Sequence, residues 1–461
     1  MVFADADERH CTEDVAVGLV VSGFDGATWH ELATDDLSAS GVAAALDAMR
    51  SRAGVDSSAS PAATAVAPGR DFAIAPVADP RTLAPADKLS RVSELYQSSR
   101  RVGGSRIVYR GAYAVVSDRD LLYIAHSDGN SRDLYQRLLW TRAGVLMIAQ
   151  RMATVGFGDA AGGDDNDDNS GDDEAAPATG PASLPMPVLE TAERAAAAGL
   201  ETIEIPLAAL DRAAQRALSL VTPTPAPAGE TEVLLEPAVT AWIVARCVAP
   251  AVRGEHWLSG LSGAAAMRDQ PVAAPFVELS DDPGATNGYG SYFFDDAGEL
   301  AGPAALIRAG RLLGPIAERH TATALGVPLT AHGRRTEQFG PLRALPSYLT
   351  LSTSDPTAAA PYEQLVASMK RGLLLEGAIA AHIDLRSWRF SVRVARAHQI
   401  VAGKRTGVLY GAVLIRGAVP DLLRAASAVS SEPAPTFAFD QPIAHSVSAP
   451  YLLTRAEVAP I

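Results

Sequence analysis

Cysteine is nearly absent from this 461-residue chain, which holds only Cys11 and Cys247. Two cysteines so far apart in the sequence do not make a disulfide framework, and such scarcity fits a reducing compartment. Cys247 lies in an apolar stretch, which favours a small core residue over a reactive thiol. The chain is long enough to stabilise two or three domains by burying apolar cores.

Lysine is almost as rare, since it occurs only at Lys88, Lys370 and Lys404. The other bases are arginines, and the 53 acidic residues give a formal net charge of −14. A nucleic-acid-binding protein normally carries a basic stripe that displaces the counterions of phosphates. Because no such stripe is visible, the composition argues against nucleic-acid binding.

Long apolar runs are missing too, and no segment approaches the roughly 20 apolar residues that cross a bilayer. The first residues, MVFADADERHCTED, are acidic and lack the basic and apolar regions of a signal peptide. We therefore expect a cytoplasmic protein without membrane contact.

The patterns that are present predict an α+β fold, because strand-like alternation and helical spacing of apolar residues both recur. In the first half we expect helices at 39–52 (capped by Ser38), 87–100, 189–198 and 207–220, and strands at 15–21, 27–32, 106–109, 113–117, 121–125, 134–140, 144–152 and 202–205. In the second half strands dominate, with helices at 315–325, 362–373 and 421–428. The expected architecture is an N-terminal mixed α/β domain, followed by a C-terminal domain dominated by antiparallel sheet with packed helices.

Two segments have irregular compositions. The alternating prolines of VTPTPAPAGE favour an extended linker, which separates an N-terminal domain at 1–222 from a C-terminal domain at 229–461. Residues 158–185 form an acidic, glycine-rich insertion typical of a solvated, disordered loop. A calcium loop is the alternative, but the register that puts Gly171 at position six puts Pro177 where a glutamate is needed.

Residues 233–263 are the stretch around which the rest of the chain is organised. The apolar run Val233–Leu235 ends at Glu236-Pro237, and apolar residues then recur at helical spacing. Pro237 suits a first helical turn, whereas Pro250 is expected to end the helix, because its ring clashes with the preceding turn and supplies no N–H. We expect a strand that leads into a buried helix.

This strand, turn and helix resemble the TldD/PmbA family, once called modulators of DNA gyrase and understood as metallopeptidases. In the TldD branch the helix carries HExxxH, whose histidines bind zinc and whose glutamate is the general base. Alignment through the VLLEP turn puts Ala245 and Arg246 at the first His and the Glu, and Pro250 at the second His. Alanine, a cation and proline neither ligate zinc nor activate water. The C-terminal region also lacks the cysteine that is a zinc ligand in the TldD branch.

The resemblance implies the TldE (PmbA) branch, the partner subunit of TldD. Such a chain would hold no metal or other cofactor, and zinc is expected in the TldD-like partner. It would form a heterodimer with that catalytic subunit, or a homodimer, and enclose a cleft in which unfolded or leader peptides are trimmed. Its own part would be to shape the cleft and to hold substrate backbone by sheet-edge pairing. Family members usually have a further strand and helix before residue 15, so we expect a shortened first domain.

Other patches of the chain resemble family segments near the cleft. The segment SGLSG at 259–263 resembles the one after the zinc motif, and it does not match the GxSxG nucleophile turn. The segment LTAHGRR at 329–335 resembles a Thr-Gly-Asn/His-Gly loop. Arginine pairs bidentately with carboxylates. The candidates for contact with a peptide or the partner are therefore Ser259, Ser262, His332, Arg334 and Arg335, with a solvated loop as the open alternative.

Two further hypotheses remain. The chain could be a metallopeptidase with relocated ligands, drawn from Glu255, His256, His320 and His332, or a scaffold that associates with itself and has no peptidase partner.

Asp295 and Asp296, in a segment resembling the family's Gly-Ser…Phe-Asp-x-Glu-Gly, could bind a cation, but the pattern Asp-Asp-x-Gly is more typical of a turn. Ala297 stands where the family has glutamate, which favours the turn.

Overall fold

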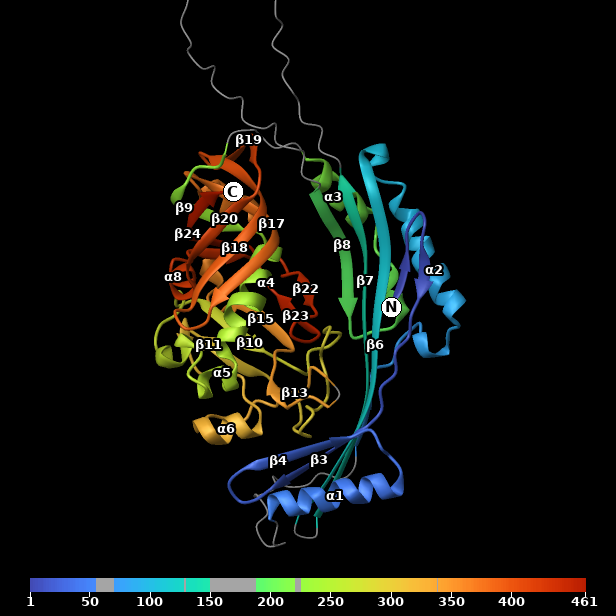
Figure 1. The fold of residues 1–461 in the computed structure, drawn as a ribbon. Helices are drawn as coiled ribbons and strands as arrows, with labels where there is room; N and C mark the ends of the chain where they lie inside the picture. Colours follow the sequence, from blue (N-terminus) through green and yellow to red (C-terminus); the bar gives the residue numbers. More distant parts are fainter. Residues whose placement is uncertain (55–69, 128–129, 150–187, 220–224, 338) are drawn as a thin grey trace, which may run out of the picture.

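The computed structural model describes residues 1–54, 70–127, 130–149, 188–219, 225–337 and 339–461. Figure 1 shows two elongated lobes, with a small unit formed by residues 19–53 below them. The lobe with β6, β7 and β8 comes from the first half of the chain, and the other lobe comes from the second half. The acidic insertion predicted at 158–185 lies outside the described residues.

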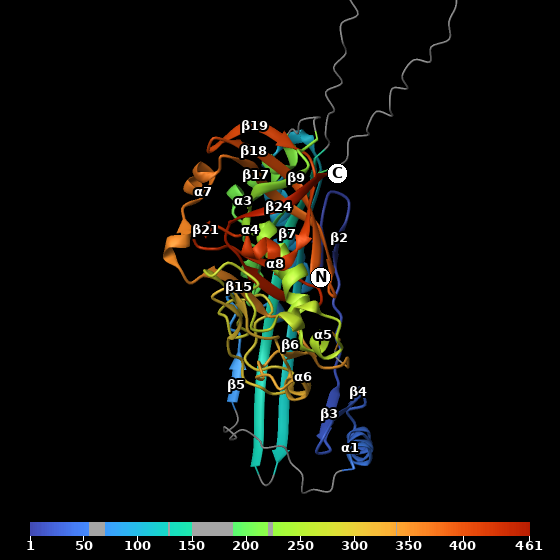
Figure 2. The same cartoon turned by 90° about the vertical axis from the view of Figure 1, so that its left-hand side faces the viewer.

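A six-stranded sheet with a long hairpin at its centre forms the N-terminal lobe. The hairpin strands, β6 (Ile107–Ser127) and β7 (Asn130–Ala149), pair antiparallel over nearly their whole length, and Figure 2 shows them running past the sheet towards α1. The sequence predicted five shorter strands here, because polar residues such as Asp118 and Asp120 interrupt the apolar pattern. Both lie on an exposed face, so the pairing continues through them. The remaining strands are β1 (Val2–Ala4), β2 (Arg9–Cys11), β5 (Arg70–Ala73) and β8 (Val188–Ala196).

Strand β8 stands where the sequence predicted an alanine-rich helix at 189–198, so that prediction is wrong. All its residues pair antiparallel with β7, from Val188 opposite Ala149 to Ala196 opposite Thr141. Helix propensity is a weak preference, and pairing along the edge of β7 overrides it. The strand predicted at 202–205 is also wrong, because Leu200–Ile203 form a 3-10 turn.

Two helices predicted from apolar spacing are present and cover this sheet. They are α2 (Pro85–Ser99) and α3 (Leu207–Leu218). Val92 and Leu210 are fully buried, and they share one apolar core with Val145 of β7.

The small unit consists of the hairpin β3 (Leu19–Phe24) and β4 (Trp29–Thr34) and helix α1 (Ala39–Ala53). Ser38 caps α1 as predicted, since its side chain accepts a hydrogen bond from the Gly41 N–H at 3.1 Å. Both strands begin later than the sequence predicted.

Glu31 of β4 fastens this unit to the C-terminal lobe. Its carboxylate accepts hydrogen bonds from both terminal nitrogens of Arg335, at 2.7 and 2.9 Å. Beside it, the guanidinium carbon of Arg319 lies 3.7 Å from the centroid of the Trp29 ring. A bidentate ion pair and a cation–π contact therefore hold the unit in place.

Replacing Glu31 by Gln is expected to loosen the β3–β4 hairpin, because Arg335 then loses a charged bidentate partner. Amide hydrogen exchange in residues 19–34 should accelerate about tenfold, the equivalent of about 1.4 kcal/mol in local opening. The exposed Asp47, which pairs with Arg50 within α1, supplies the control variant Asp47→Asn, and this variant should leave the hairpin unchanged. Equal amide exchange rates in Glu31→Gln and the native protein would show that the Glu31–Arg335 ion pair does not hold the hairpin in place.

Two sheets build the C-terminal lobe. The first closes on itself, since β24 pairs with both β20 and β9. Its strands are β9 (Gly229–Leu235), β16 (Ala359–Ala360), β17 (Arg371–Asp384), β18 (Arg389–Val401), β19 (Lys404–Tyr410), β20 (Val413–Ala418), β21 (Ala428–Ser430) and β24 (Leu452–Pro460). The second contains β10 (Val277–Asp281), β11 (Ala304–Arg308), β12 (Arg311–Leu312), β15 (Tyr348–Thr353), β22 (Thr436–Phe439) and β23 (His445–Ser448).

Short elements complete this lobe: the strand pair β13 (Gly333–Arg334) and β14 (Arg343–Ala344), and the helices α5 (Gly254–Leu258), α6 (Arg319–Leu325), α7 (Tyr362–Ser368) and α8 (Val419–Arg424). The last three helices are shorter than the sequence predicted. Gly326 ends α6 in the left-handed conformation, at φ 61°, which glycine adopts without strain.

The segment predicted to be central lies at the core of this lobe. Val233, Leu234 and Leu235 of β9 are completely buried, and the helix that follows, α4 (Pro237–Ile243), packs in the same core as residues of both sheets. The predicted α+β class with a sheet-rich C-terminal half is confirmed. Among the described helices, none is long and apolar enough to span a bilayer.

Candidate functional site

The helical segment after β9 carries the three positions that the sequence aligns with a zinc motif. It begins as α4, widens into a π-helical turn at Val244–Val248 and tightens into a 3-10 turn at Ala249–Val252. The α and π turns end at Val248, shortly before Pro250, as the sequence predicted. A 3-10 turn continues through Pro250, because an early position of such a turn needs no N–H bond. The π turn holds Ala245 and Arg246, and such turns are rare and often occur at functional sites.

Arg246 projects from the π turn towards the loop between β22 and β23. Its Nη1 donates a hydrogen bond to the Gln441 carbonyl at 3.0 Å. Its guanidinium carbon also lies 5.7 and 5.6 Å from the ring centroids of Trp242 and Phe439. Partial burial lowers the pKa of Arg246, and the nearby carboxylate of Asp440 opposes that shift. A permanent cation, in cation–π contact with two aromatic rings, therefore occupies the position aligned with the general base.

Zinc does not fit these residues. Ala245 is buried and offers only a methyl group, and the Pro250 side chain has no lone pair. Arg246 would repel a divalent cation. Within the ranges that the structure describes, no group of three or more His, Cys, Asp or Glu side chains is placed to hold a metal ion.

The relocated-ligand hypothesis drew on Glu255 and His256, which lie in helix α5 and not on a strand. Glu255 pairs with Arg253, and the Nδ1 atom of His256 lies 2.7 Å from the Pro250 carbonyl oxygen. His320 is exposed at the start of α6. These side chains form no donor cluster in the described part of the chain.

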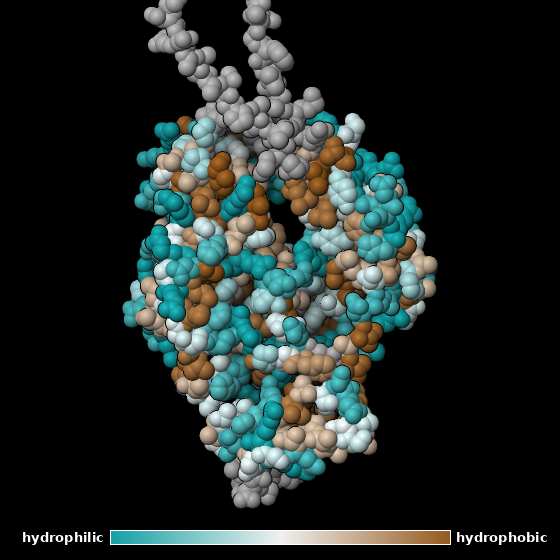
Figure 3. Space-filling view, in the orientation of Figure 1, coloured by the Kyte–Doolittle hydropathy of each residue, from teal (hydrophilic) through white to brown (hydrophobic). Residues whose placement is uncertain are grey.

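An ion bridge joins the two lobes beside Arg246. Arg142 of β7 pairs with Glu193 of β8, at 2.6 Å, and with Asp440 of the second lobe. The Tyr289 hydroxyl also donates to Asp440, at 2.6 Å. Figure 3 shows the molecule hollowed between the lobes, and the bridge spans from one lobe to the other.

The two predicted serines occupy different environments. Ser259 is exposed at the end of α5, and its hydroxyl donates to the Glu255 carbonyl at 2.8 Å. Ser262 is buried; its hydroxyl donates to the Ala251 carbonyl at 2.7 Å and accepts from the Ala264 N–H at 3.2 Å. Ser262 thus fixes the loop to the helical segment, whereas a peptide contact by Ser259 stays a prediction.

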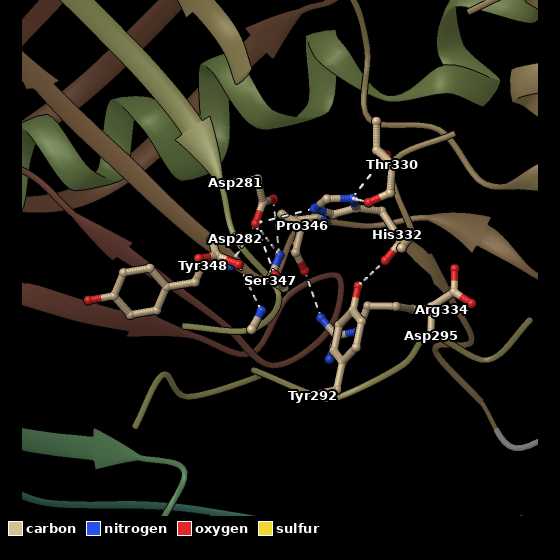
Figure 4. A network of polar contacts seen from close by, with 12 residues as sticks. Asp281, Asp282, Tyr292, Asp295, Thr330, His332, Arg334, Pro346, Ser347 and Tyr348 are labelled. Atoms are coloured by element: carbon tan, nitrogen blue, oxygen red, sulfur yellow. Dashed lines mark hydrogen bonds and ion pairs between the residues drawn. The ribbon is translucent and has the colours of Figure 1, made fainter. Parts of the chain in front are cut away.

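The loop that the sequence singled out at 329–335 turns its charged end inward, as Figure 4 shows for His332 and Arg334. The Nδ1 atom of His332 lies 2.6 Å from the Thr330 carbonyl oxygen, and its Nε2 lies 3.4 Å from Asp281. Arg334, only 2% exposed, donates to the carbonyls of Pro346 and Ala444 at 2.6 and 2.9 Å. Arg335 holds Glu31. All three predicted residues therefore have partners within the chain, and their contact with a peptide stays untested.

Asp281 is the centre of this network, and it is not among the candidates predicted from the sequence. It is fully buried and accepts hydrogen bonds from the Ser347 hydroxyl at 2.9 Å and the Tyr348 N–H at 2.8 Å. Burial raises the pKa of Asp281, but His332 and these backbone amides outweigh burial and hold it below its usual value. The signal that could have found it is the alternation of β10, whose inward face is Val277, Leu279 and Asp281.

Ser347, His332 and Asp281 are the residue types of a hydrolytic triad, but their geometry differs from one. The Ser347 hydroxyl donates to Asp281 and not to the imidazole, so His332 is not placed to take its proton as the histidine of a triad does. All three side chains are sealed from solvent. The network therefore stabilises the fold and presents no nucleophile to a substrate.

The neighbouring pair Asp295 and Asp296 has the turn role favoured from the sequence. Asp295 accepts hydrogen bonds from the backbone N–H groups of Ala297, Glu299 and Gly333 at 2.9, 3.0 and 2.7 Å. Complete burial raises the pKa of Asp295 to about 7, although these amides oppose the shift. Asp296 accepts from the Arg335 N–H, so the pair fastens the turn to the 329–335 loop.

Comparison with known proteins adds three similarities. The family model described as the PmbA/TldA metallopeptidase C-terminal domain matches residues 228–459. A metalloprotease of Methanocaldococcus jannaschii is 27% identical over 220 residues, 48% of either chain. A TldD homologue of Haemophilus influenzae, also named a metalloprotease, is 27% identical over 44% of this chain and 41% of its own. The chain thus spans about half the length of the curated relatives it matches.

Solved structures share the fold over nearly the whole chain. A structure titled putative modulator of DNA gyrase, from Bacteroides thetaiotaomicron, gives a TM-score of 0.70 at 14% identity, covering 100% of this chain and 92% of the other. TldE from Thermococcus kodakarensis gives 0.69 at 15% identity, covering 99% and 93%. At such identities the likeness establishes the fold alone.

Proposed function

The chain belongs to the PmbA/TldD metallopeptidase family, and we propose that it is the non-catalytic, TldE-like subunit of a heterodimeric peptidase. In this proposal a TldD-like partner carries the zinc and cleaves unfolded or leader peptides. The present chain contributes the second wall of the substrate cleft. A stand-alone enzyme with relocated ligands and a scaffold without a partner are the alternatives.

The observation that carries the proposal is the set of residues in the helical segment after β9. The helical segment is retained, yet Ala245, Arg246 and Pro250 replace every group that would bind zinc or activate water. Arg246 is also engaged by Trp242, Phe439 and the Gln441 carbonyl. These contacts stabilise the cation where catalysis would need a carboxylate, which supports a structural role.

The edges of two sheets support the substrate-holding part of the proposal. Among the described residues, β8 pairs with β7 alone, and β22 is the last strand of its six-stranded sheet. Both lie on the sides of the lobes that meet at the Arg142 bridge, since Glu193 belongs to β8 and Asp440 follows β22. An extended peptide can add to such an edge through backbone hydrogen bonds.

Co-expression tests the heterodimer directly. A tagged form of this chain should retain an untagged HExxxH-bearing relative from the same genome through affinity and size-exclusion steps, and the pair should hydrolyse an unfolded peptide. Replacing the motif glutamate of the relative should abolish hydrolysis, whereas Arg246→Ala in this chain should retain it, since Arg246 takes no part in water activation. A relative that elutes separately and is fully active alone would contradict the proposal.

A further inference from the structure

A pocket of about 390 Å³ opens within the C-terminal lobe. Its walls come from segments 300–305, 313–315 and 327–331, together with Arg268. Every lining residue belongs to the second half of the chain, so the pocket is complete without the N-terminal lobe. The third wall includes Leu329, Thr330 and Ala331, the first residues of the loop whose later residues turn inward.

The pocket exists because the hairpin of β11 and β12 opens early. These strands pair only at Ile307 with Leu312 and at Arg308 with Arg311. Continuing this register would place Pro315 opposite Ala304, and proline has no N–H to donate to a ladder. The strands therefore separate beyond Leu313, whose N–H makes the last bond across the hairpin, to the Leu306 carbonyl at 2.8 Å.

Two glycines near the point where β11 and β12 separate have backbone groups that are free to bond a ligand. Within the part of the chain that the structure describes, the backbone N–H and C=O of Gly302 and Gly314 have no hydrogen-bond partner in the protein. A Cβ atom added to either residue would meet nothing within 4 Å. The pocket thus offers unused donors and acceptors beside empty space, an arrangement suited to a ligand that has a backbone of its own.

The rest of the lining combines apolar walls with a cation. Leu300 and Leu329 are 40% and 43% exposed, which is high for leucine, and Pro303, Pro315 and Pro328 add further apolar surface. Arg268 also lines the pocket, and its nearest carboxylate, Asp269, is 3.9 Å away, beyond hydrogen-bond distance. An apolar pocket with one available guanidinium fits a ligand that has both an apolar group and a carboxylate.

We propose that this pocket binds the C-terminal residue of a peptide that ends in a large apolar side chain. The side chain fills the space between Leu300 and Leu329, the backbone bonds to the open peptide groups of Gly302 and Gly314, and the terminal carboxylate pairs with Arg268. The site goes beyond the proposed function, because it lies within one lobe and needs neither zinc nor a partner subunit.

Binding of N-acetyl-Gly-Gly-Phe and of its C-terminal amide, measured by calorimetry on the purified full chain, tests this site. The native protein should bind the acid about tenfold more tightly than the amide, because only the acid offers a charged partner to Arg268. Arg268→Gln should lower the affinity for the acid to that for the amide. Arg308→Gln, which removes an exposed arginine of β11 outside the pocket, should leave both affinities unchanged.

Gly314→Phe supplies a second, independent variant, since it fills the empty space at a position with an ordinary backbone conformation. It should abolish binding of both peptides while retaining the thermal midpoint of the native protein. Equal affinity of the native protein for acid and amide, native-like binding by Gly314→Phe, or no binding at all would overturn the inference. None of these results depends on a peptidase partner, so failure here leaves the proposed function untouched.

Discussion

Replacing Asp281 by Asn is expected to destabilise the protein by about 3 kcal/mol. The carboxylate is fully buried, accepts bonds from the Ser347 hydroxyl and the Tyr348 N–H, and lies 3.4 Å from His332. An asparagine of the same shape loses the negative charge and presents an NH₂ group where an acceptor is needed. Urea-induced unfolding at pH 7 measures the change.

Asp282 supplies a matched control for that experiment. It is the next residue along the chain, and its carboxylate accepts a hydrogen bond from the exposed Gly284 N–H at 3.0 Å. Asp282→Asn keeps this acceptor, so the expected change is below about 0.5 kcal/mol. A loss below about 1 kcal/mol for Asp281→Asn would show that the network does not hold the lobe together.

Acidification from pH 7 to pH 4 is expected to remove about 3 kcal/mol of stability through His445. Asp295 acts in the opposite direction over this interval, because its raised pKa of about 7 means that the folded chain takes up a proton there before the unfolded chain does. Burial lowers the pKa of His445 from 6.5 to about 4, and Arg334 contributes to the shift, while the Ile443 carbonyl and Asp281 oppose it. Between these two pKa values the unfolded chain binds a proton that the folded chain excludes, so stability falls as the pH falls. Asp281, whose pKa is held below 3.8, adds a further loss only at lower pH.

The variant His445→Gln isolates this contribution, because glutamine does not titrate. Its unfolding free energy should decline less steeply than that of the native protein between pH 6.5 and 4, by about 3 kcal/mol over the interval. The comparison of slopes remains valid even if the variant is less stable at every pH. Parallel curves for the two proteins would show that His445 takes up its proton in the folded state.

The C-terminal half was largely predictable from the sequence because its strands alternate clearly and its turns contain glycine. Residues 389–401, for example, alternate buried and less buried side chains along β18. In the N-terminal half, alanine-rich β8 was predicted as a helix, because alanine carries little information about strand pairing and the edge of β7 decides its conformation. The long β6–β7 hairpin was broken into pieces because its exposed Asp118 and Asp120 look like turn residues.

The candidate site, too, was only partly predictable from the sequence. The loss of donors at Ala245, Arg246 and Pro250 can be read from the chain, because chemistry that needs specific atoms is excluded when the residues lack them. The packing of Arg246 against Trp242 and Phe439 could not be predicted, since the two rings lie far apart in sequence and meet only in the folded lobe.

The metal content of the purified chain is the measurement that tests the central claim most directly. The protein, expressed alone with added zinc and freed of loosely bound ions by gel filtration, should hold far less than one zinc per chain and should not hydrolyse peptides. A content near one zinc per chain, together with peptide hydrolysis that a chelator abolishes, would show that the catalytic centre survives elsewhere in this chain.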